Sequence, residues 1–492
     1  MTEAASISHN KVEKPLGDAG WALSQVKEPH QKTCAIIGAG ASGICLAKYL
    51  LEVGLDVTVF EIGTKIGGMW VYENDSGRSS AYKTLHINTA KNLTNYSDFK
   101  FKDSVQRFPS HYDMHEYLHE YAEYFGVKER IRFRSEVTNI EPLFTPGEEE
   151  PRWRLETVDG MQREFDTVCV ATGHLTKPLH VSDFQDGFEG EYMHSHYYRT
   201  PESFKGKRVC IVGVGNSAVD IASDMCVITD RCVMVARSGV MIAPKLIFGF
   251  PVTDISMKLF QPWIPDKLRR KIIELMTRLV HGRMEDYGFK PLTRRAHPTT
   301  SATIMQDVAY NRVAVKQGIE KIDGKTIHFV DGTSEEFDVL LACTGYLIDL
   351  PFLSERLVPI DDNNVELYKR IVPVDWPGLY ILGMIMTTTA LNWSFEEQAR
   401  WVREFILGNA IMPKREEMLR DIEKKKAFIA KYYKESTRHH IEEEHMYYFM
   451  ELHKSLRRGK WRRFRQRIRG WFSNESSRAP SQQAAGLEAG AE

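Results

Sequence analysis

The sequence predicts an α/β fold in which two similar strand–turn–helix units occur in one chain. Two glycine-rich turns carry this prediction, Gly38-Ala-Gly-Ala-Ser-Gly43 and, 175 positions later, Gly213-Val-Gly-Asn-Ser-Ala218. Each turn follows a short apolar run, 33–37 or 208–212, and opens a stretch of helical periodicity. A strand that leads through such a turn into a helix is the usual start of a dinucleotide-binding unit.

The first unit has the features of a Rossmann-like FAD site. Gly38, Gly40 and Gly43 permit a tight turn whose backbone N–H groups, with the positive end of the helix, suit a pyrophosphate. The next apolar run, 56–60, ends at Glu61, 23 residues after Gly38. An acidic residue near this position binds the two ribose hydroxyls of a dinucleotide. The sequence therefore predicts FAD in the first unit.

The second unit differs at the corresponding position. The turn residues expected to contact its cofactor are Gly213, Gly215, Asn216 and Ser217. The following apolar run, 232–236, ends at Arg237, 24 residues after Gly213. A guanidinium forms paired hydrogen bonds with phosphate oxygens, so an arginine here favours a 2′-phosphate. The sequence therefore predicts NADPH in the second unit, and two redox carriers in one chain indicate an oxidoreductase.

The order of the apolar runs predicts that the NADPH domain is inserted into the FAD domain. Two buried runs, 168–173 and 337–346, both contain Thr-Gly and are expected to be the crossings between the domains. The predicted parts are a flexible segment 1–29, a first FAD piece 30–184, an NADPH domain 185–334 with a helical insert near 244–290, a second FAD piece 335–440, and a basic amphipathic segment with a disordered tail 441–492.

Composition narrows the class of protein and its surroundings. The formal net charge is −1, and the body outside the basic segment is mildly acidic, which argues against nucleic acid as a partner. The seven cysteines include no C-x-x-C pair, and four lie in apolar strands, which indicates a reducing, cytoplasmic location. The chain has no signal-peptide pattern at its N-terminus and no apolar run of 18 residues.

The C-terminal segment predicts a basic amphipathic helix. Residues 454–469 hold nine lysines and arginines and no acid. Aromatic and aliphatic side chains recur among them at helical spacing: Trp461, Phe464, Ile468, Trp471 and Phe472. Such a helix is typical of peripheral contact with an anionic membrane, and equally of a helix packed on the body with its charges in water. A homodimer is also left open.

Several motifs, in order from Thr33 to Trp401, resemble flavin-containing monooxygenases. They are the Glu61 unit, Gly67-Gly68-Met69-Trp70, Leu-His-Ile-Asn88-Thr-Ala-Lys, Tyr96-Ser-Asp-Phe99, Phe188-x-Gly190-x₃-His194-x₃-Tyr198, the second glycine turn, Thr344-Gly345-Tyr346, Pro351-Phe-Leu353 and Gln398-Ala-Arg-Trp401. Their joint occurrence in this order identifies the chain as a member of that family of class B flavoprotein monooxygenases. The run 295–299 and the insert resemble bacterial members more than animal ones.

The resemblance implies an activity and additional site residues. NADPH would reduce FAD, a C4a-hydroperoxyflavin would form with O₂, and a small lipophilic substrate would be oxygenated at nitrogen or sulfur. Asn88 would be the catalytic residue, with its amide beside the flavin. The other residues that the resemblance places at the cofactors are Gly68, Trp70, Val137, Tyr198 and Gln398. His194 is expected to orient the linker between the domains.

Two other functions remain open. One is Baeyer–Villiger oxidation of ketones, which Tyr198 disfavours because those relatives usually carry Trp there. The other is a non-catalytic nucleotide-binding redox adaptor, which the intact glycines, Glu61, Arg237 and Asn88 disfavour. The sequence His115-Glu-Tyr-Leu-His119 matches a zinc-protease pattern, but no third ligand is evident, so no metal site is predicted. The run His439–His445 is expected to be a solvated helical face.

Overall fold

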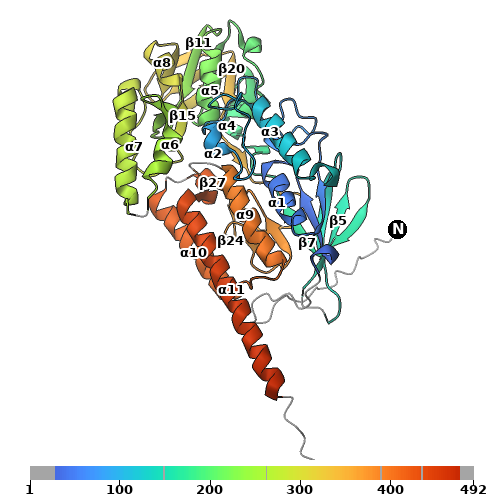
Figure 1. The fold of residues 1–492 in the computed structure, drawn as a ribbon. Coiled ribbons are helices and arrows are strands. Elements are labelled where there is room, and N and C mark those ends of the chain that lie inside the picture. Colours follow the sequence, from blue (N-terminus) through green and yellow to red (C-terminus); the bar gives the residue numbers. More distant parts are fainter. Residues whose placement is uncertain (1–27, 148–149, 262, 388–390, 434–435, 477–492) are drawn as a thin grey trace, which may run out of the picture.

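The computed structural model describes residues 28–476 except 148–149, 262, 388–390 and 434–435. Figure 1 shows two lobes, with β7 and α1 in the lower lobe and β11 and β20 in the upper. The predicted N-terminal segment lies almost entirely outside the described residues, as does the chain beyond residue 476. Each lobe is built on a parallel five-stranded sheet, and so the predicted α/β fold is confirmed.

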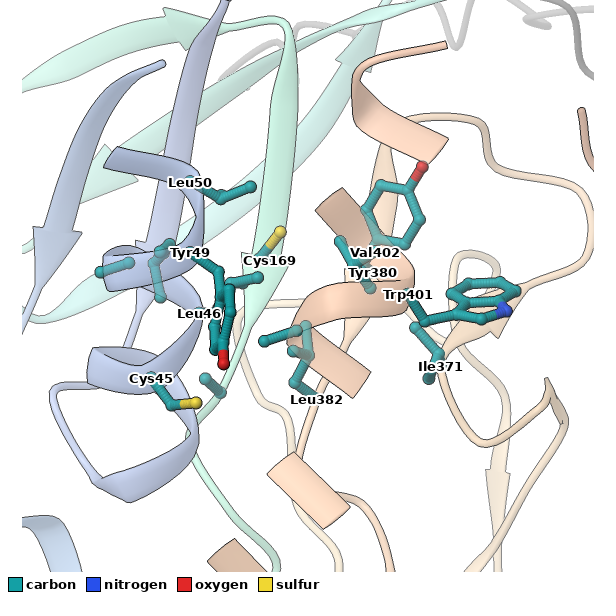
Figure 2. Close-up of a cluster of buried hydrophobic side chains, with 14 of the residues drawn as sticks. Cys45, Leu46, Tyr49, Leu50, Cys169, Ile371, Tyr380, Leu382, Trp401 and Val402 are labelled. Carbon is teal, nitrogen blue, oxygen red and sulfur yellow. The ribbon is translucent and has the colours of Figure 1, made fainter. Parts of the chain in front are cut away.

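The sheet of the lower lobe has the strand order β26-β7-β1-β2-β3. Its strands are β1 (Thr33–Ile37), β2 (Asp56–Phe60), β3 (Ile131–Arg132), β7 (Thr167–Val170) and β26 (Leu379–Ile381). Helix α1 (Ala41–Leu51) connects β1 to β2 and packs against α9 (Leu391–Ile406). Figure 2 shows the apolar contact in which Leu46 and Leu50 of α1 lie near Cys169 of β7 and Val402 of α9.

Other elements complete the lower lobe. They are η1 (Pro29–Gln31), η2 (Gly68–Trp70), α2 (Lys91–Thr94), α3 (His111–Tyr124), η3 (Lys128–Arg130), the antiparallel strands β4 (Val137–Leu143), β5 (Arg152–Thr157) and β6 (Gln162–Phe165), and the short strands β8 (Lys177–Pro178), β21 (Tyr346–Leu347), β22 (Ile360–Asp361), β23 (Asn364–Val365), β24 (Leu367–Tyr368) and β25 (Val372–Pro373). Helix α3 begins with a capping box, in which Ser110 and Asp113 exchange side-chain and backbone hydrogen bonds.

The sheet of the upper lobe has the order β16-β11-β10-β20-β9. Its strands are β9 (Glu191–His194), β10 (Arg208–Val212), β11 (Arg231–Val235), β16 (Val313–Lys316) and β20 (Val339–Ala342). Around it lie α4 (Ser182–Gly187), η4 (Ser195–Tyr197), η5 (Glu202–Phe204), α5 (Asn216–Met225), α8 (Ile304–Ala309) and the antiparallel strands β17 (Ile319–Asp323), β18 (Thr326–Phe329) and β19 (Ser334–Glu336). The strands of the upper sheet lie between β7 and β26 of the lower sheet in the sequence. The predicted insertion of the second unit into the first is therefore confirmed.

One predicted boundary needs correction. Residue 335 was expected to begin the second FAD piece, but β20 pairs in parallel with β10 and β9 of the upper sheet. The upper sheet therefore extends through Ala342. The strand is fully buried and apolar, and its sequence alone does not say which of two parallel sheets it joins.

The predicted helical insert is present in the upper lobe. It contains β12 (Ile242–Pro244), β13 (Leu246–Ile247), β14 (Phe250–Pro251), α6 (Val252–Leu259), α7 (Asp266–His281) and η6 (Met284–Tyr287), and β15 (Thr299–Ser301) follows it. Strands β12 and β15 pair in parallel, which holds the beginning and the end of this region together.

The C-terminal part of the chain packs on the lower lobe. Its elements are β27 (Met386–Thr387), α9, α10 (Arg415–Tyr432), η7 (Thr437–Ile441), β28 (Glu442–Glu443) and α11 (His445–Ser476). Tyr448 and Leu452 at the start of α11 are buried in the same apolar core as α1 and α9. Further along, the helix extends away from the body (Figure 1). It continues to Ser476.

The run His439–His445 is not the solvated helical face predicted from the sequence. Glu442 and Glu443 form a short strand, and both are almost completely buried, as are His439 and His445. Each glutamate has a cationic or imidazole partner from a distant part of the chain, which compensates its burial. These partners are more than 70 residues away, so the local sequence contains no sign of them.

Candidate cofactor site

The first glycine loop, residues 38–43, lies between β1 and α1 and requires glycine for steric reasons. Gly38 has a φ of +104°, and a Cβ atom there would lie 2.7 Å from the carbonyl oxygen of Ala171. A Cβ at Gly43 would lie 1.9 Å from the carbonyl oxygen of Gly38. No side chain caps the N-terminus of α1, where Gly40 is the N-cap residue. The loop therefore presents backbone and a positive helix end, the arrangement that binds a pyrophosphate.

The Gly67-Gly68 turn comes close to this loop. Gly68 has a φ of +56°, and a Cβ there would lie 3.2 Å from the Cα of Gly40. Gly67 donates its N–H to the carbonyl oxygen of Ala39 at 3.0 Å. Trp70 closes the same turn and is partly buried against the core of α1. The structure thus brings Gly40 and Gly68 together as two faces of one cradle, in which a Cβ on Gly68 would press on Gly40.

Glu61 lies at the end of β2, beside this cradle. Its carboxylate accepts hydrogen bonds from Ala39 N–H at 2.8 Å and from Gly63 N–H at 2.9 Å. Burial raises the pKa of Glu61, although both backbone hydrogen bonds oppose the rise. The acid predicted to bind a ribose therefore contacts the glycine loop directly.

Several buried side-chain atoms have no hydrogen-bond partner among the described residues, and two of them are oxygen atoms of the lower lobe next to segments discussed above. They are Oδ1 of Asn88, just before α2, and Oγ1 of Thr172, just after β7. The Cα of Thr172 lies 3.3 Å from the position of a Cβ on Gly38, so this hydroxyl is next to the first glycine loop. Buried polar atoms are normally paired, so these two atoms indicate polar partners outside the protein chain. Together with the uncapped helix, they fit a dinucleotide cofactor.

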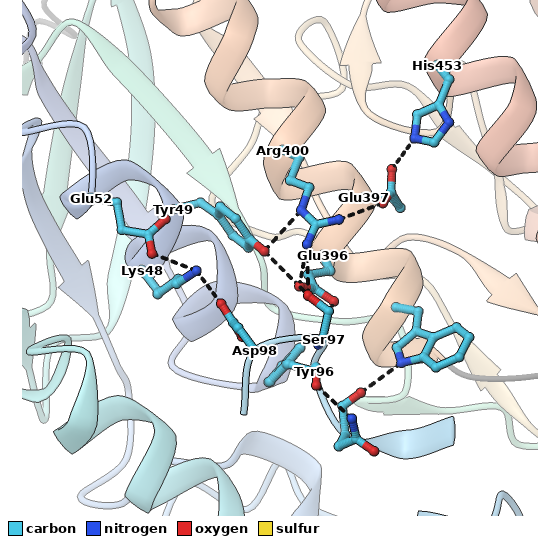
Figure 3. A network of polar contacts seen from close by, with 12 residues as sticks. Lys48, Tyr49, Glu52, Tyr96, Ser97, Asp98, Glu396, Glu397, Arg400 and His453 are labelled. Carbon is cyan, nitrogen blue, oxygen red and sulfur yellow. Dashed lines mark hydrogen bonds and ion pairs between the residues drawn. The ribbon is translucent and has the colours of Figure 1, made fainter. Parts of the chain in front are cut away.

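The Tyr96-Ser-Asp segment supports the first loop from behind. Tyr96 donates its hydroxyl to the carbonyl oxygen of Ala41 at 2.7 Å. Glu396 of α9 is 2% exposed and accepts from Ser97 N–H at 3.1 Å, from Tyr49 at 2.7 Å and from Arg400 at 2.9 Å. Figure 3 shows this network joining α1, the 96–98 segment and α9. It fixes the helix whose N-terminus forms the site.

Gln398 is not placed as the resemblance implies. It is completely buried, and its amide accepts from Gly383 N–H at 3.0 Å and donates to the hydroxyl of Tyr448 at 2.8 Å. Both ends of the amide are therefore used inside the protein. Gly383 in turn lies against Ser42 of the first loop, since a Cβ there would be 3.0 Å from the serine Oγ. Gln398 therefore acts on the site through Gly383.

Val137 begins β4 and is buried in the apolar cluster that also contains Ile37 and Phe60. Its side chain is a core residue. A role at the cofactor would have to come from its backbone, and that role stays a proposal.

The second glycine loop, residues 213–217, repeats the geometry of the first. Gly213 has a φ of +127°, and a Cβ there would lie 2.5 Å from the carbonyl oxygen of Cys343. Helix α5 begins at Asn216 with Gly215 as its N-cap and no side-chain cap. Asn216 accepts through Oδ1 from Thr300 N–H at 2.9 Å, while Ser217 is exposed. The loop therefore offers a second uncapped helix end for a phosphate group.

Arg237 follows β11, next to this loop, and its side chain is exposed. Lys290 reaches the same place and donates to the carbonyl oxygen of Arg237 at 3.2 Å. Arg237 and Lys290 thus lie at the position in the upper lobe that corresponds to Glu61 in the lower lobe. This difference in charge agrees with different dinucleotides in the two loops.

The 188–198 signature is a structural element of the upper lobe. A Cβ at Gly190 would lie 2.6 Å from the ring of Phe188, and Tyr198 is 1% exposed with its hydroxyl donating to Asp224 at 3.2 Å. The predicted contact of Tyr198 with a cofactor is therefore replaced by core packing. His194 accepts from His196 N–H at 3.0 Å, and its burial lowers the pKa to about 4, so it is neutral at physiological pH.

Residues 77–85 connect the lower lobe to the upper lobe. Tyr82 is buried in the core of the upper lobe, and its hydroxyl donates to Asp220 of α5 at 2.9 Å. Arg199 donates to the carbonyl oxygen of Ser79 at 3.1 Å. Burial raises the pKa of Asp220 to about 6. The sequence gives no sign of these contacts, since Tyr82 lies in no recognisable motif.

The residues of the zinc-protease pattern lie on α3, where the glutamate forms an ion pair and the first histidine is partly buried. Glu116 pairs with Lys102 at 2.9 Å, and burial lowers the pKa of His115. Among the residues that the structure describes, no group of three or more His, Cys, Asp or Glu side chains is arranged to hold a metal ion.

Comparisons with known proteins agree with this geometry. The model of the flavin-binding monooxygenase-like family matches residues 31–459. Flavin-containing monooxygenase 5 of Oryctolagus cuniculus is 32% identical over 434 residues, which are 84% of this chain and 81% of that protein. Dimethylaniline monooxygenase (N-oxide-forming) 2 of Rattus norvegicus is 30% identical over 407 residues, 80% of this chain and 76% of that protein.

Solved structures also match over most of the chain. S-allyl-L-cysteine S-oxygenase from Allium sativum has a TM-score of 0.66 and 25% identity, and the match covers 86% of this chain and 88% of that one. A cyclohexanone monooxygenase has a TM-score of 0.62 at 18% identity, covering 87% of this chain and 99% of that one, and shows the shared fold alone. The predicted likeness to bacterial members stays a prediction.

Two glycine loops, one with an acid and one with an arginine at the matching position, define a flavoprotein with two dinucleotide sites. The chain belongs to the flavin-binding monooxygenase-like family. It is an FAD-containing, NADPH-dependent monooxygenase.

Proposed function

We propose that this monooxygenase transfers one oxygen atom from O₂ to nitrogen or sulfur of a small lipophilic substrate. The observation that supports it most directly is the pair of uncapped glycine-loop helices, α1 and α5, with contrasting charges at Glu61 and Arg237. One relative is named as N-oxide-forming and another as an S-oxygenase, and these names agree with nitrogen and sulfur as the atoms that are oxygenated.

The protein's own residues bind, orient and shield the two cofactors. We propose that the first loop binds the FAD pyrophosphate, that Asn88 and Thr172 bind further polar atoms of this cofactor, and that Arg237 binds the 2′-phosphate of NADPH. FAD reduced by NADPH supplies the activation of O₂. No nucleophile or acid–base pair of the protein is needed for the oxygen transfer, which explains why none is evident in the sequence.

The test is a product assay with purified, FAD-loaded protein. Tertiary amines, thioethers and ketones are supplied with NADPH and O₂, and products are counted against NADPH consumed. We expect N-oxides and sulfoxides, with little ester from the ketones. Ester as the main product would support the Baeyer–Villiger alternative, and NADPH consumption without any oxygenated product would contradict the proposal.

We also propose that the projecting part of α11 contacts an anionic membrane surface. Trp461, Phe464, Ile468 and Trp471 are each between 40% and 59% exposed. Basic residues surround them, and Arg465 lies over the ring of Trp461 at 5.2 Å. The packed part of the helix ends near Arg462, whose guanidinium binds Glu417 at 2.9 Å. Among the described residues, no helix is long and apolar enough to cross a membrane.

Ending the chain after Arg463 tests this contact while keeping the packed part of α11. The truncation removes four arginines, of which 465, 467 and 469 lie in α11 and are each worth about 1 kcal/mol near an anionic surface. We expect binding to phosphatidylserine-containing vesicles to fall by roughly 100-fold in a flotation assay, with unchanged NADPH consumption. Neutral phosphatidylcholine vesicles are the control, and equal flotation of both chains would contradict the contact. The homodimer stays a prediction, which sedimentation velocity would test. The cytoplasmic location also stays a prediction.

A further inference from the structure

A buried glutamate lies where the two lobes meet. Glu442 belongs to β28, which pairs in parallel with β27 of the lower lobe, and β27 lies between the lobes in Figure 1. Its side chain is 1% exposed and accepts a hydrogen bond from Nδ1 of His297 at 2.9 Å. His439 is the other imidazole nearby, at 3.9 Å. Burial alone would raise the pKa of Glu442, but the attraction of these imidazoles lowers it to about 2, so the group is a carboxylate at neutral pH.

His297 is only two and three residues from the threonines that hold the second glycine loop. Thr299 donates its hydroxyl to the carbonyl oxygen of Val214 at 2.8 Å. Thr300 donates its N–H to Oδ1 of Asn216 at 2.9 Å. Both acceptors belong to the loop that opens α5. A displacement of His297 would therefore move the loop that we propose binds NADPH.

On the other side, β27 is close to the first glycine loop. It begins three residues after Gly383, which lies against Ser42 of that loop and is held by Gln398. The chain from Ser42 through Gly383, β27, β28 and Glu442 to His297 thus connects the two loops by short steps. The steps are a van der Waals contact, a hydrogen bond, a strand pair and stretches of two or three residues of backbone.

We propose that Glu442 is a positioning residue, which through His297 fixes the second glycine loop relative to the first. The inference rests on the proposed cofactor roles of the two loops. Hydride transfer requires the nicotinamide and the flavin to meet in one geometry, and a misplacement of about 1 Å can slow a reaction by roughly 100-fold. The contact between Glu442 and His297 sets this geometry without touching either cofactor.

The variants Glu442→Gln and His297→Gln test the contact from both sides. We expect each to slow the reduction of FAD at saturating NADPH by roughly 10- to 100-fold in anaerobic stopped flow, with unchanged FAD content. We also expect faster amide hydrogen exchange in residues 213–219, a readout that does not depend on turnover. The exchanged pair, Glu442→His with His297→Glu, restores opposite partners and is expected to recover much of the rate.

Glu443→Gln is the matched control. Glu443 is the neighbouring buried glutamate of the same strand, and its partners are Arg370 at 2.9 Å and Lys425 of α10 at 2.6 Å, on the lower-lobe side. We expect this variant to reduce FAD at the wild-type rate. Equal effects of Glu442→Gln and Glu443→Gln, or a normal rate in both Glu442→Gln and His297→Gln, would overturn the positioning role. If Glu442→Gln does not fold, His297→Gln decides alone. A wild-type protein that binds FAD but is not reduced by NADPH would instead contradict the proposed function.

Discussion

Alanine at Gly43 and at Gly40 should both remove FAD, but for different physical reasons. A Cβ at position 43 would lie 1.9 Å from the carbonyl oxygen of Gly38, so the loop itself must distort. A Cβ at position 40 has only the Cα of Gly68 nearby, at 3.8 Å, which the protein tolerates. Gly40→Ala would therefore occupy only the space that the cofactor needs. We expect Gly43→Ala to be unstable and Gly40→Ala to be folded without bound flavin.

The expected magnitudes separate the two variants. Overpacking costs about 1–3 kcal/mol, which corresponds to a loss in FAD affinity of roughly 10- to 100-fold for Gly40→Ala. For Gly43→Ala, the same strain lowers the free energy of unfolding, and we therefore expect a lower melting temperature. Visible flavin absorbance after gel filtration and thermal unfolding measure the two effects. Gly187→Ala is the control, because its φ is not positive and a Cβ there would have its nearest neighbour at 4.0 Å. Full flavin content in Gly40→Ala would contradict the assignment of this cradle.

The sequence predicted the parts of the site that depend on local geometry. Gly38 and Gly213 could be recognised because each has a positive φ at the start of its turn, and Gly43 because its Cβ would meet Gly38 within the same turn. The charge contrast of Glu61 and Arg237 could be recognised for a similar reason. Both residues end the second strand of their unit, so counting from the glycines finds them.

The sequence could not predict which distant side chains meet. The resemblance places Gln398 at the flavin, yet its two partners in the structure are Gly383 and Tyr448, which no motif links to it. The glutamates at 442–444 were read as solvated because runs of charge usually are, and only the fold supplies His297, Arg370 and Arg269 as partners. Tyr198 was assigned through its position in a motif that, in the structure, packs the core of the upper lobe.

The difference between local and distant contacts also explains which structural features the family motifs maintain. Phe188, Gly190, Tyr96 and Trp401 are recognisable as a pattern, but the structure places them in packing and in support of the loops. They keep two lobes and two helix starts in place. We propose that specificity for one dinucleotide over another depends instead on a few exposed residues, of which Arg237 is the clearest.

Replacing Arg237 by alanine should therefore change cofactor preference more than it changes stability. Its side chain is exposed beside the second glycine loop, so little packing is lost. A hydrogen bond to a charged group contributes about 1.5–3 kcal/mol, so we expect kcat/KM for NADPH to fall by roughly 10- to 100-fold. The value for NADH, which has no 2′-phosphate, should stay the same. Arg237→Lys should retain part of the preference, because an ammonium supplies charge without the paired geometry of a guanidinium.

The clearest comparison is between the rates with NADPH and with NADH, measured on the same variant. A general defect in folding or in FAD binding would lower the rates with NADPH and NADH by the same factor, whereas loss of a 2′-phosphate contact lowers only the first. Arg130→Ala in the lower lobe is the control for removal of a surface cation, since Arg130 is 48% exposed and its ion-pair distance to Asp56 is 3.6 Å. If Arg237→Ala kept the wild-type ratio of NADPH to NADH rates, Lys290 would be the remaining cation at this position, and Lys290→Ala would have to change the ratio. Unchanged ratios in both variants would refute the assignment of the 2′-phosphate to this end of β11.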